Sequence, residues 1–538
     1  MAKSRVFVIG LDGGSWNVID PLIERGKLPN LGRLKEEGAW GGLMSTLPPV
    51  TCPAWFTFST GLQPSRLGIY DFRGISRGSD RVSLHTYKEI RQPELWDLLM
   101  EAGNTCGIIN NPLVYPLKRH SGYVVPGFIT PQEEFRTYPE GLMGELDRVA
   151  GGYEVDQQAM TIVDDETLLD DCLRVLGKRI KAMTYLLREY PSDFFLGVFT
   201  ATDRICHCFM NQAFLGEGEE RARGWEALEQ VFSLVDEGMG KILEMVSEED
   251  FLIIMSDHGF EARPWNFNIN QWLVDERLLS VKVVGGLEKM GLTQRGIGRL
   301  LQRMGLMNLA YRMAPGKLVK MVPAGETSQG EYFIHNLLER GRVDWSRTRA
   351  VSMGYSYYLN TQDRPQGILS SREAAEVKLQ IAEGMKELTD PGGGREGIEL
   401  LETAAAYGTE VPVDPPDQMM RESGGWQLRS SLTKSGEIFT RNERAGHSME
   451  GIFVLHHPWA KEGEIAEPLG IEDLAPLILR LFGLPVPVEM DGRMRPDIFK
   501  EDTPPQKEGP MSFKPDATGA EKERIRRRIA ALRQSDTA

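Results

Sequence analysis

The stretch FLIIMSDHGF, residues 251–260, decides the fold of this chain. Its first five residues are apolar without interruption, which is typical of a strand buried on both faces of a parallel sheet. Asp257 and His258 follow, and Gly259 lets the chain turn. Ligands bind beyond the carboxyl ends of strands in open α/β sheets, so this carboxylate and imidazole suit a metal site. An ordinary polar strand exit would look the same in isolation.

The same arrangement recurs at two other predicted strands. Residues 5–11 (RVFVIGL) and 193–200 (DFFLGVFT) are apolar runs, and Asp12 and Asp203 follow them. Helical patterns separate the strands, at about residues 16–37, 164–188 and 225–245. This alternation predicts an α/β fold, with a doubly wound, mostly parallel sheet and helices on both faces.

Polar residues also cluster on the predicted helix that follows residue 203. Asp203 and His207 are four residues apart, so they share one helix face and could hold a metal ion together. The alternative is an ordinary polar pair. Cys206 and Cys208 flank the histidine but point off that face, which predicts packing roles.

A threonine stands at another predicted helix start. Pro53 favours a helix that begins nearby, with Thr51 at or near its N-cap. That position lies in the positive field of the helix N-terminus, where anions bind. A plain capping threonine is the alternative. His447 precedes the last predicted core strand, at residues 451–456.

Seven side chains are therefore expected to meet at one edge of the sheet. They are Asp12, Thr51, Asp203, His207, Asp257, His258 and His447. Carboxylates and imidazoles form a ligand set that suits Zn²⁺ or Mn²⁺, and a site with two such ions can stabilise displacement at phosphorus.

Several motifs resemble one known family, the type I phosphodiesterase/nucleotide pyrophosphatase branch of the alkaline phosphatase superfamily. They are VFVIGLDGGSW, PPVTCPAWFTFSTGLQPSRLGIYDF, TATDRICH, SDHGF and AGHSMEGIFVL, with IEDLAPLILRLFGLPVP behind them. Their order and spacing carry the resemblance, which covers about residues 4–270 and 440–497. It implies an alkaline-phosphatase-like core and the hydrolysis of phosphodiesters or nucleotide pyrophosphates.

The resemblance also implies roles for the candidate residues. One divalent metal ion would be held by Asp203, His207 and His447, and a second by Asp12, Asp257 and His258, with the Thr51 oxygen shared. Zn²⁺ is the expected metal and Mn²⁺ the alternative. Thr51 would be the nucleophile and form a phospho-threonine. Metal coordination lowers the pKa of a hydroxyl, which is otherwise a poor nucleophile.

Substrate-binding groups are less well defined by the sequence. The Cys52 amide at the helix start could donate to a phosphate oxygen. Nucleotide pyrophosphatases bind phosphate with an asparagine about twenty residues after the nucleophile, but here Phe72 stands there, and Arg73 is a candidate substitute. Many relatives carry a histidine where this chain has Leu67. The substrate is expected to be a small phosphate ester, with nucleotides among the candidates.

Other activities stay open as alternatives. A phosphomonoesterase or phosphotransferase of the same superfamily is one, and a catalytically inactive phosphate- or nucleotide-binding protein is another. The sulfatase branch is excluded because its C-x-P-x-R motif needs a cysteine and an arginine where this chain has Thr51 and Trp55.

Changes in composition along the chain predict its domain organisation. Residues 1–270 and 440–497 are expected to form the catalytic core, and 271–439 an inserted cap. The cap is expected to include a basic amphipathic helix at about 295–313 and a strand at 352–360. Residues 498–538 would be a flexible tail with a short charged helix at about 520–534.

Composition limits the partners and the location. The 538 residues carry a formal net charge of −15, which argues against broad nucleic-acid binding. No apolar stretch is long enough for a transmembrane helix. The five cysteines form no paired framework, and no signal peptide is recognisable, so a cytoplasmic location is expected. The oligomeric state does not follow from the sequence.

Overall fold

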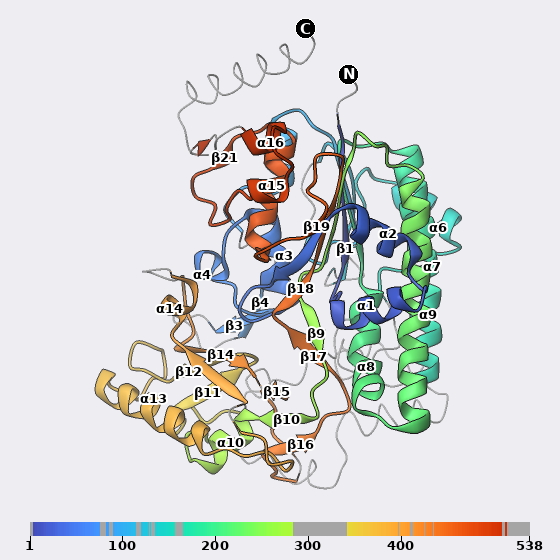
Figure 1. Ribbon diagram of the computed structural model, residues 1–538. Coiled ribbons are helices and arrows are strands. Elements are labelled where there is room, and N and C mark those ends of the chain that lie inside the picture. The colour runs from blue at the N-terminus through green and yellow to red at the C-terminus, as the bar shows by residue number, and fades with distance from the viewer. Residues whose placement is uncertain are drawn as a thin grey trace, which may run out of the picture.

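The structure is a computed structural model, shown in Figure 1. It describes residues 4–75, 82–85, 90–114, 120–128, 130, 135–156, 165–282, 342–395, 397–408, 413–423, 425–433, 435–507 and 512–513. The helices predicted at about 295–313 and 520–534 lie outside these ranges.

A nine-stranded sheet forms the centre of the larger lobe, in the order β19-β2-β18-β8-β1-β7-β5-β6, with β20 paired to β2. Its strands are β1 (Val6–Leu11), β2 (Ala39–Met44), β5 (Cys106–Ile109), β6 (Gly122–Val125), β7 (Phe194–Phe199), β8 (Phe251–Met255), β18 (Glu450–His456), β19 (Gly463–Glu464) and β20 (Leu469–Gly470). Of these, β18 runs antiparallel to its neighbours β2 and β8, while the other pairings are parallel.

Alternate side chains of β1 enter two different cores. Phe7, Ile9 and Leu11 pack with one set of helices, and Val6 and Val8 with another. The first set is α1 (Trp16–Glu24), α2 (Pro29–Glu37), α6 (Leu142–Ala150), α7 (Asp165–Glu189), α8 (Ala201–Leu215) and α9 (Gly218–Leu243). The second is α3 (Thr51–Thr60), α5 (Leu95–Glu101) and α15 (Leu474–Leu481). Helices on both faces of a mostly parallel sheet confirm the predicted fold class.

A smaller lobe lies below the sheet in Figure 1 and contains two further sheets. One joins β11 (Ala350–Met353), β12 (Ser356–Leu359), β14 (Gln418–Glu422) and β13 (Ile398–Leu401), and the other joins β15 (Trp426–Arg429), β10 (Trp265–Asn268) and β16 (Phe439–Arg441). The helices α10 (Ile269–Asp275), α13 (Ser371–Lys386) and α14 (Thr403–Tyr407) complete the described part of this lobe.

The single strand predicted at 352–360 was wrong. The chain forms a β11–β12 hairpin there, because Gly354 takes a left-handed conformation with φ of +53° and reverses its direction. The predicted cap limits, residues 271 and 439, stay a prediction. β10 lies just before the first limit, β16 begins at the second, and the two strands pair antiparallel.

Short elements connect the two lobes and the end of the described chain. They are α4 (Pro64–Leu67), β3 (Arg73–Ile75), β4 (Val82–Leu84), β9 (Gly259–Glu261), β17 (Gly446–Ser448), the 3₁₀ helices η4 (Ile471–Asp473) and η5 (Pro496–Ile498), β21 (Val486–Pro487), α16 (Pro504–Lys507) and β22 (Ser512–Phe513). Within the described ranges, no helix is both long and apolar enough to cross a membrane. The five cysteines are buried and form no disulfide bond, while the cytoplasmic location stays a prediction.

Candidate metal centre

The carboxyl ends of β1, β7 and β8 bring four of the candidate residues together. Because β1 pairs in parallel with both β7 and β8, these three strands end at one edge of the sheet. Asp12 follows β1 directly, and Asp257 and His258 follow β8. Asp203 lies in the first turn of α8, which begins just after β7.

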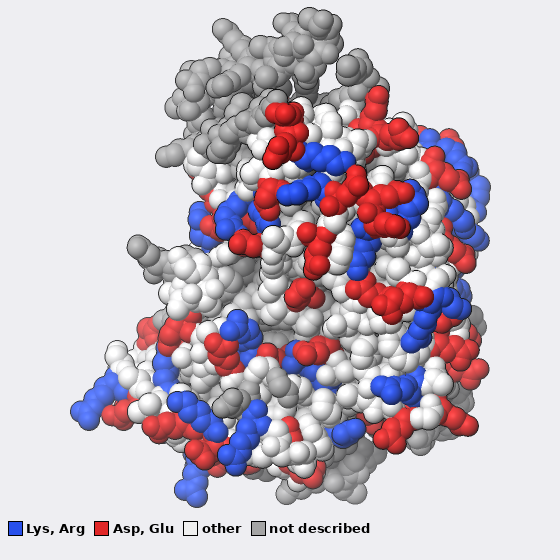
Figure 2. All heavy atoms as spheres, in the orientation of Figure 1, with Lys and Arg blue, Asp and Glu red and all other residues white. Residues whose placement is uncertain are grey.

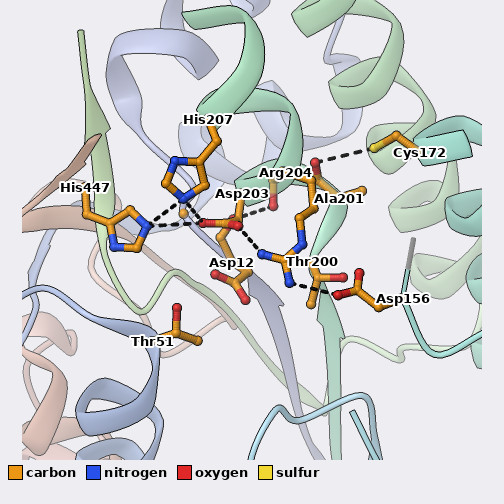
Figure 3. A network of polar contacts seen from close by, with 12 residues as sticks. Asp12, Thr51, Asp156, Cys172, Thr200, Ala201, Asp203, Arg204, His207 and His447 are labelled. Atoms are coloured by element: carbon orange, nitrogen blue, oxygen red, sulfur yellow. Dashed lines mark hydrogen bonds and ion pairs between the residues drawn. The ribbon is translucent and has the colours of Figure 1, made fainter. Parts of the chain in front are cut away.

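The first group of possible ligands contains Asp203, His207 and His447. Asp203 Oδ1 lies 3.4 Å from Nε2 of each histidine, and the two Nε2 atoms are 3.0 Å apart. Figure 3 shows the two imidazoles converging on this carboxylate. His447 reaches the group on β17, whose pairing with β9 places His447 opposite Phe260.

The second group contains Asp12, Asp257 and His258. His258 Nε2 lies 3.7 Å from Asp12 Oδ1 and 3.5 Å from Asp257 Oδ2. The Thr51 hydroxyl oxygen lies 3.3 Å from the same nitrogen. The rings of His258 and His447 stack with their centroids 3.6 Å apart, so the two groups are adjacent.

Backbone carbonyls orient all three imidazoles. Nδ1 of His207 lies 3.0 Å from the Ala445 oxygen, and Nδ1 of His447 lies 2.7 Å from the Pro49 oxygen. Nδ1 of His258 lies 3.1 Å from the Gly259 oxygen. A carbonyl only accepts, so each Nδ1 carries the proton and each Nε2 keeps a lone pair for a metal ion.

Several buried carboxylate oxygens in this centre have no hydrogen-bond donor. They are both oxygens of Asp12, Oδ1 of Asp203 and Oδ2 of Asp257. All three side chains are almost fully buried. Buried polar atoms in native proteins nearly always have a partner, and unpaired buried carboxylates are especially costly. A divalent cation is the partner that these oxygens fit.

The spacing of the donor atoms fits the same partner. A zinc ion binds nitrogen and carboxylate oxygen at about 2.0–2.2 Å, so a tetrahedral shell separates its ligand atoms by about 3.3–3.6 Å. The donor separations given above for the two groups run from 3.0 to 3.7 Å. Both groups could therefore hold a metal ion without large rearrangement.

Burial shifts the pKa values of these groups strongly. Burial, reinforced by Asp203, raises the pKa of Asp257 to about 7, and burial with the nearby Asp257 raises that of Asp12 well above its ordinary value. Burial lowers the pKa of His207 to about 3 and that of His258 well below its ordinary value. Neutral imidazoles are the form that binds metal, and a bound cation would reverse the carboxylate shifts.

These shifts predict a pH dependence for the metal-free protein. Near pH 7 the raised pKa values of Asp257 and Asp12 favour protonated carboxyl groups in the folded chain, whereas both groups are ionised in the unfolded chain. The lowered pKa values of His207 and His258 act in the opposite direction, and their effect fades above about pH 6.5. The folded state then binds more protons, so its stability falls as pH rises, by up to about 1.4 kcal/mol per pH unit for each carboxyl group. Urea unfolding between about pH 6.5 and 7.5 measures this slope, because the contribution of Asp257 ends as pH rises through its pKa of about 7.

Metal addition is expected to flatten that slope, because bound cations hold both carboxylates ionised. Equal slopes with and without metal would contradict the prediction.

A glycine lets the two strand ends come close. Gly13 has φ of +65°, and a Cβ there would lie 2.3 Å from the Phe260 ring. Its amide donates to Asp257 Oδ1 over 3.2 Å. Only glycine meets both demands, so this position holds Asp12 and Asp257 in register.

The helix that carries Thr51 begins at this residue, earlier than the start near Ala54 that the sequence predicts, although Thr51 does lie next to the N-cap as expected. Val50 is the N-cap and Thr51 the first helical residue, because proline is tolerated anywhere in the first turn and Pro53 does not delay the start. Thr51 still lies at the helix N-terminus. The Cys52 side chain packs in the apolar core, while its amide belongs to the first turn.

Arg73 lies at the start of β3 and is half-buried beside Asp71. Burial lowers the pKa of Arg73 to about 10, and burial raises that of Asp71 to about 6. A substrate-binding role for Arg73 stays a prediction.

Sequence reasoning missed Arg204 and Asp156. Arg204 donates to Asp203 and to Asp156, and its guanidinium lies 4.9 Å from the Phe128 ring centre. A signal was present for Arg204, since a charged residue follows the candidate ligand directly. Asp156 lies in a loop 48 residues from Arg204, and nothing local marks it.

Comparison with known proteins identifies the family. A sequence model of the type I phosphodiesterase/nucleotide pyrophosphatase family matches residues 6–313. The chain belongs to this family. It is therefore a phosphoric ester hydrolase of the alkaline phosphatase superfamily, which confirms the resemblance seen in the sequence. Members of this family depend on metal ions, and the chain has two groups able to hold them.

The chain is also similar to solved structures. Phosphonoacetate hydrolase from Sinorhizobium meliloti 1021, in complex with phosphonoformate, is 14% identical with a TM-score of 0.51, over 89% of this chain and 95% of that chain. Inactive murine ectonucleotide pyrophosphatase/phosphodiesterase 5 with AMP is 12% identical with a TM-score of 0.49, over 92% and 100%. At such identities the first likeness shows the fold alone. No curated protein matches the sequence.

Proposed function

We propose that this protein hydrolyses phosphodiesters or nucleotide pyrophosphates at a site for two divalent metal ions, through a phospho-threonine at Thr51. The observation that carries this proposal is the pair of ligand groups described above, with the Thr51 hydroxyl 3.3 Å from His258 Nε2. Their donors stand at metal-ligand spacing around carboxylate oxygens that have no other partner.

Each of the two groups of residues would hold one metal ion. Asp203, His207 and His447 would hold one ion, and Asp12, Asp257 and His258 the other. When bound, the ions would lower the pKa of the nearby hydroxyl and neutralise the phosphoryl charge. Zn²⁺ suits this mixed set of three imidazoles and three carboxylates, and Mn²⁺ is the alternative.

Thr51 would carry the covalent chemistry. Its Oγ1 would lose its proton and bond to phosphorus as the bond to the leaving ester or anhydride oxygen breaks, and the leaving group would take up a proton. Water would then cleave the Oγ1–phosphorus bond, which would release a phosphomonoester and return a proton to Thr51. The first-turn amides of α3, including that of Cys52, could donate to the non-bridging oxygens. Thr51 would then act as the nucleophile, which a threonine that only caps a helix does not do.

The surface charge fits a small substrate. The net charge is −15, and on the face shown in Figure 2 Lys and Arg side chains are interspersed with Asp and Glu. Nucleic-acid-binding surfaces usually gather basic residues on one face. Among small esters, a nucleotide stays a candidate, although Phe72 stands where the phosphate-binding asparagine would be.

Metal analysis and a substrate panel test this proposal together. We expect about two equivalents of Zn²⁺ or Mn²⁺ per chain, and faster turnover of bis-nitrophenyl phosphate and nucleotide pyrophosphates than of nitrophenyl phosphate. Faster monoester turnover would favour the phosphomonoesterase alternative, and phosphate transfer to an added alcohol would favour the phosphotransferase. Absence of bound metal, or of turnover with any ester, would contradict the proposal.

A further inference from the structure

We infer that Arg204 is a positioning residue that makes Asp203 a one-oxygen metal ligand, and that Asp156 balances the charge of Arg204. This inference rests on the proposed function, because it assigns Asp203 to a metal site. Arg204 and Asp156 would not bind the metal ion themselves, because Arg204 contacts the ligand Asp203 and Asp156 contacts Arg204.

The contacts of Asp203 divide cleanly between its two oxygens. Oδ1 lies 3.4 Å from Nε2 of both His207 and His447 and has no hydrogen-bond donor. Oδ2 accepts a hydrogen bond of 2.5 Å from Nη1 of Arg204. In Figure 3 the guanidinium approaches the carboxylate from the side opposite the two imidazoles. One oxygen therefore faces the ligand group and the other faces the arginine.

This division has a consequence for metal binding. A carboxylate can bind a cation through one oxygen or through both. Hydrogen bonds to the carboxylate, from residues that do not contact the metal ion themselves, fix which of the two occurs. With Oδ2 held by Arg204, Asp203 offers Oδ1 alone. Three protein donors then leave a position in a four-coordinate shell for a substrate or hydroxyl oxygen.

The charge of Arg204 needs a second partner. A guanidinium paired with Asp203 alone would cancel the negative charge that the metal ion requires. Asp156 provides that partner, since its Oδ2 accepts from Nη2 of Arg204 over 2.8 Å. The Arg204 and Asp156 side chains are 8% and 2% exposed, so both charges are shielded from water. The Arg204–Asp156 pair is neutral by itself, and Asp203 keeps its charge.

The loop that carries Asp156 is itself held in place. Arg179 on α7 donates to the Val155 carbonyl, and its Nη1 donates to Thr200 Oγ1 over 2.8 Å. Arg179 therefore ties the loop to the residue that precedes α8. This fixes Asp156 against the helix from which Arg204 and Asp203 project.

Cobalt substitution tests this inference without an activity assay. Wild type, Arg204→Met and Asp156→Asn would be titrated with Co²⁺ while visible absorption is recorded, and affinity measured against a competing chelator. Four-coordinate Co²⁺ absorbs far more strongly than Co²⁺ with more ligands. Arg495→Met is the matched control, because Arg495 is an equally buried arginine paired with a carboxylate, that of Asp497, away from the ligand groups.

We expect Arg204→Met to lose visible absorption per bound ion, as both oxygens of Asp203 bind. We also expect the affinity for one of the two ions to fall about tenfold or more in Arg204→Met and in Asp156→Asn. A loss of this size is usual when a residue that hydrogen-bonds to a metal ligand is removed. Arg495→Met should match wild type. A folded Arg204→Met protein with wild-type spectrum and affinity would overturn the inference.

If Arg204→Met does not fold, Asp156→Asn decides alone. A tenfold loss of affinity supports the inference, and wild-type affinity overturns it. Failure of the proposed function is distinguishable, since wild type itself would then give only the weak spectrum of hydrated Co²⁺.

Discussion

Replacing Thr51 with alanine is expected to reduce turnover by about 10³-fold or more while leaving metal content and folding intact. The variant loses the oxygen that would bond to phosphorus, but the six ligand residues remain. Thr51 is the first residue of α3, where alanine is a good helix former, so the helix should persist. Diester turnover, metal analysis and circular dichroism measure the three quantities.

Two further variants test whether the loss of activity comes from the Thr51 hydroxyl itself. Thr57→Ala removes an equally buried hydroxyl from the same helix and should keep most activity, because Thr57 belongs to neither ligand group. Thr51→Ser keeps a hydroxyl and should retain measurable turnover. A phosphorylated chain should be trapped by acid quenching in wild type and be missing in Thr51→Ala. Full activity of Thr51→Ala would remove the nucleophile assignment.

Replacing Asp12 with asparagine is expected to have opposite effects on activity and on metal-free stability. An amide binds divalent ions far more weakly than a carboxylate, so metal content should fall from about two to one, and turnover by about 10³-fold. Without metal, the variant should unfold at a higher temperature than metal-free wild type. Burial and the charge of Asp257 raise the pKa of Asp12 well above its ordinary value, which makes its ionised form destabilising.

Thermal unfolding with and without chelator measures this crossover at pH 8. Asp20→Asn serves as the control, since Asp20 forms only a partly exposed ion pair with Lys35 and should alter neither quantity. A metal-free Asp12→Asn protein less stable than metal-free wild type would show that the carboxylate has a structural partner.

Local sequence carried much of the information about the candidate site. Asp12, Asp257 and His258 could be selected because they lie within three residues of the end of an apolar strand, and parallel strands place such residues at one edge. His207 could be added because helical spacing places it beside Asp203. The structure brings these side chains together, and their roles stay a proposal.

Other features could not be predicted because they depend on contacts between distant segments. The carbonyls that orient His207 and His447 belong to Ala445 and Pro49, which are 238 and 398 residues away from them. The two small sheets of the lower lobe contain strands of only three to five residues, too short for a clear periodicity.

The sequence by itself determined the fold class, the family and the chemical types of residue at the strand ends, because strand burial and the polar residues after each strand are local properties. Only the tertiary structure decided which oxygen of Asp203 faces the histidines and which faces Arg204. That choice depends on Asp156, on a loop held by Arg179. Side-chain orientation in a buried site is set by the packing and hydrogen bonds of distant segments, which no local pattern records.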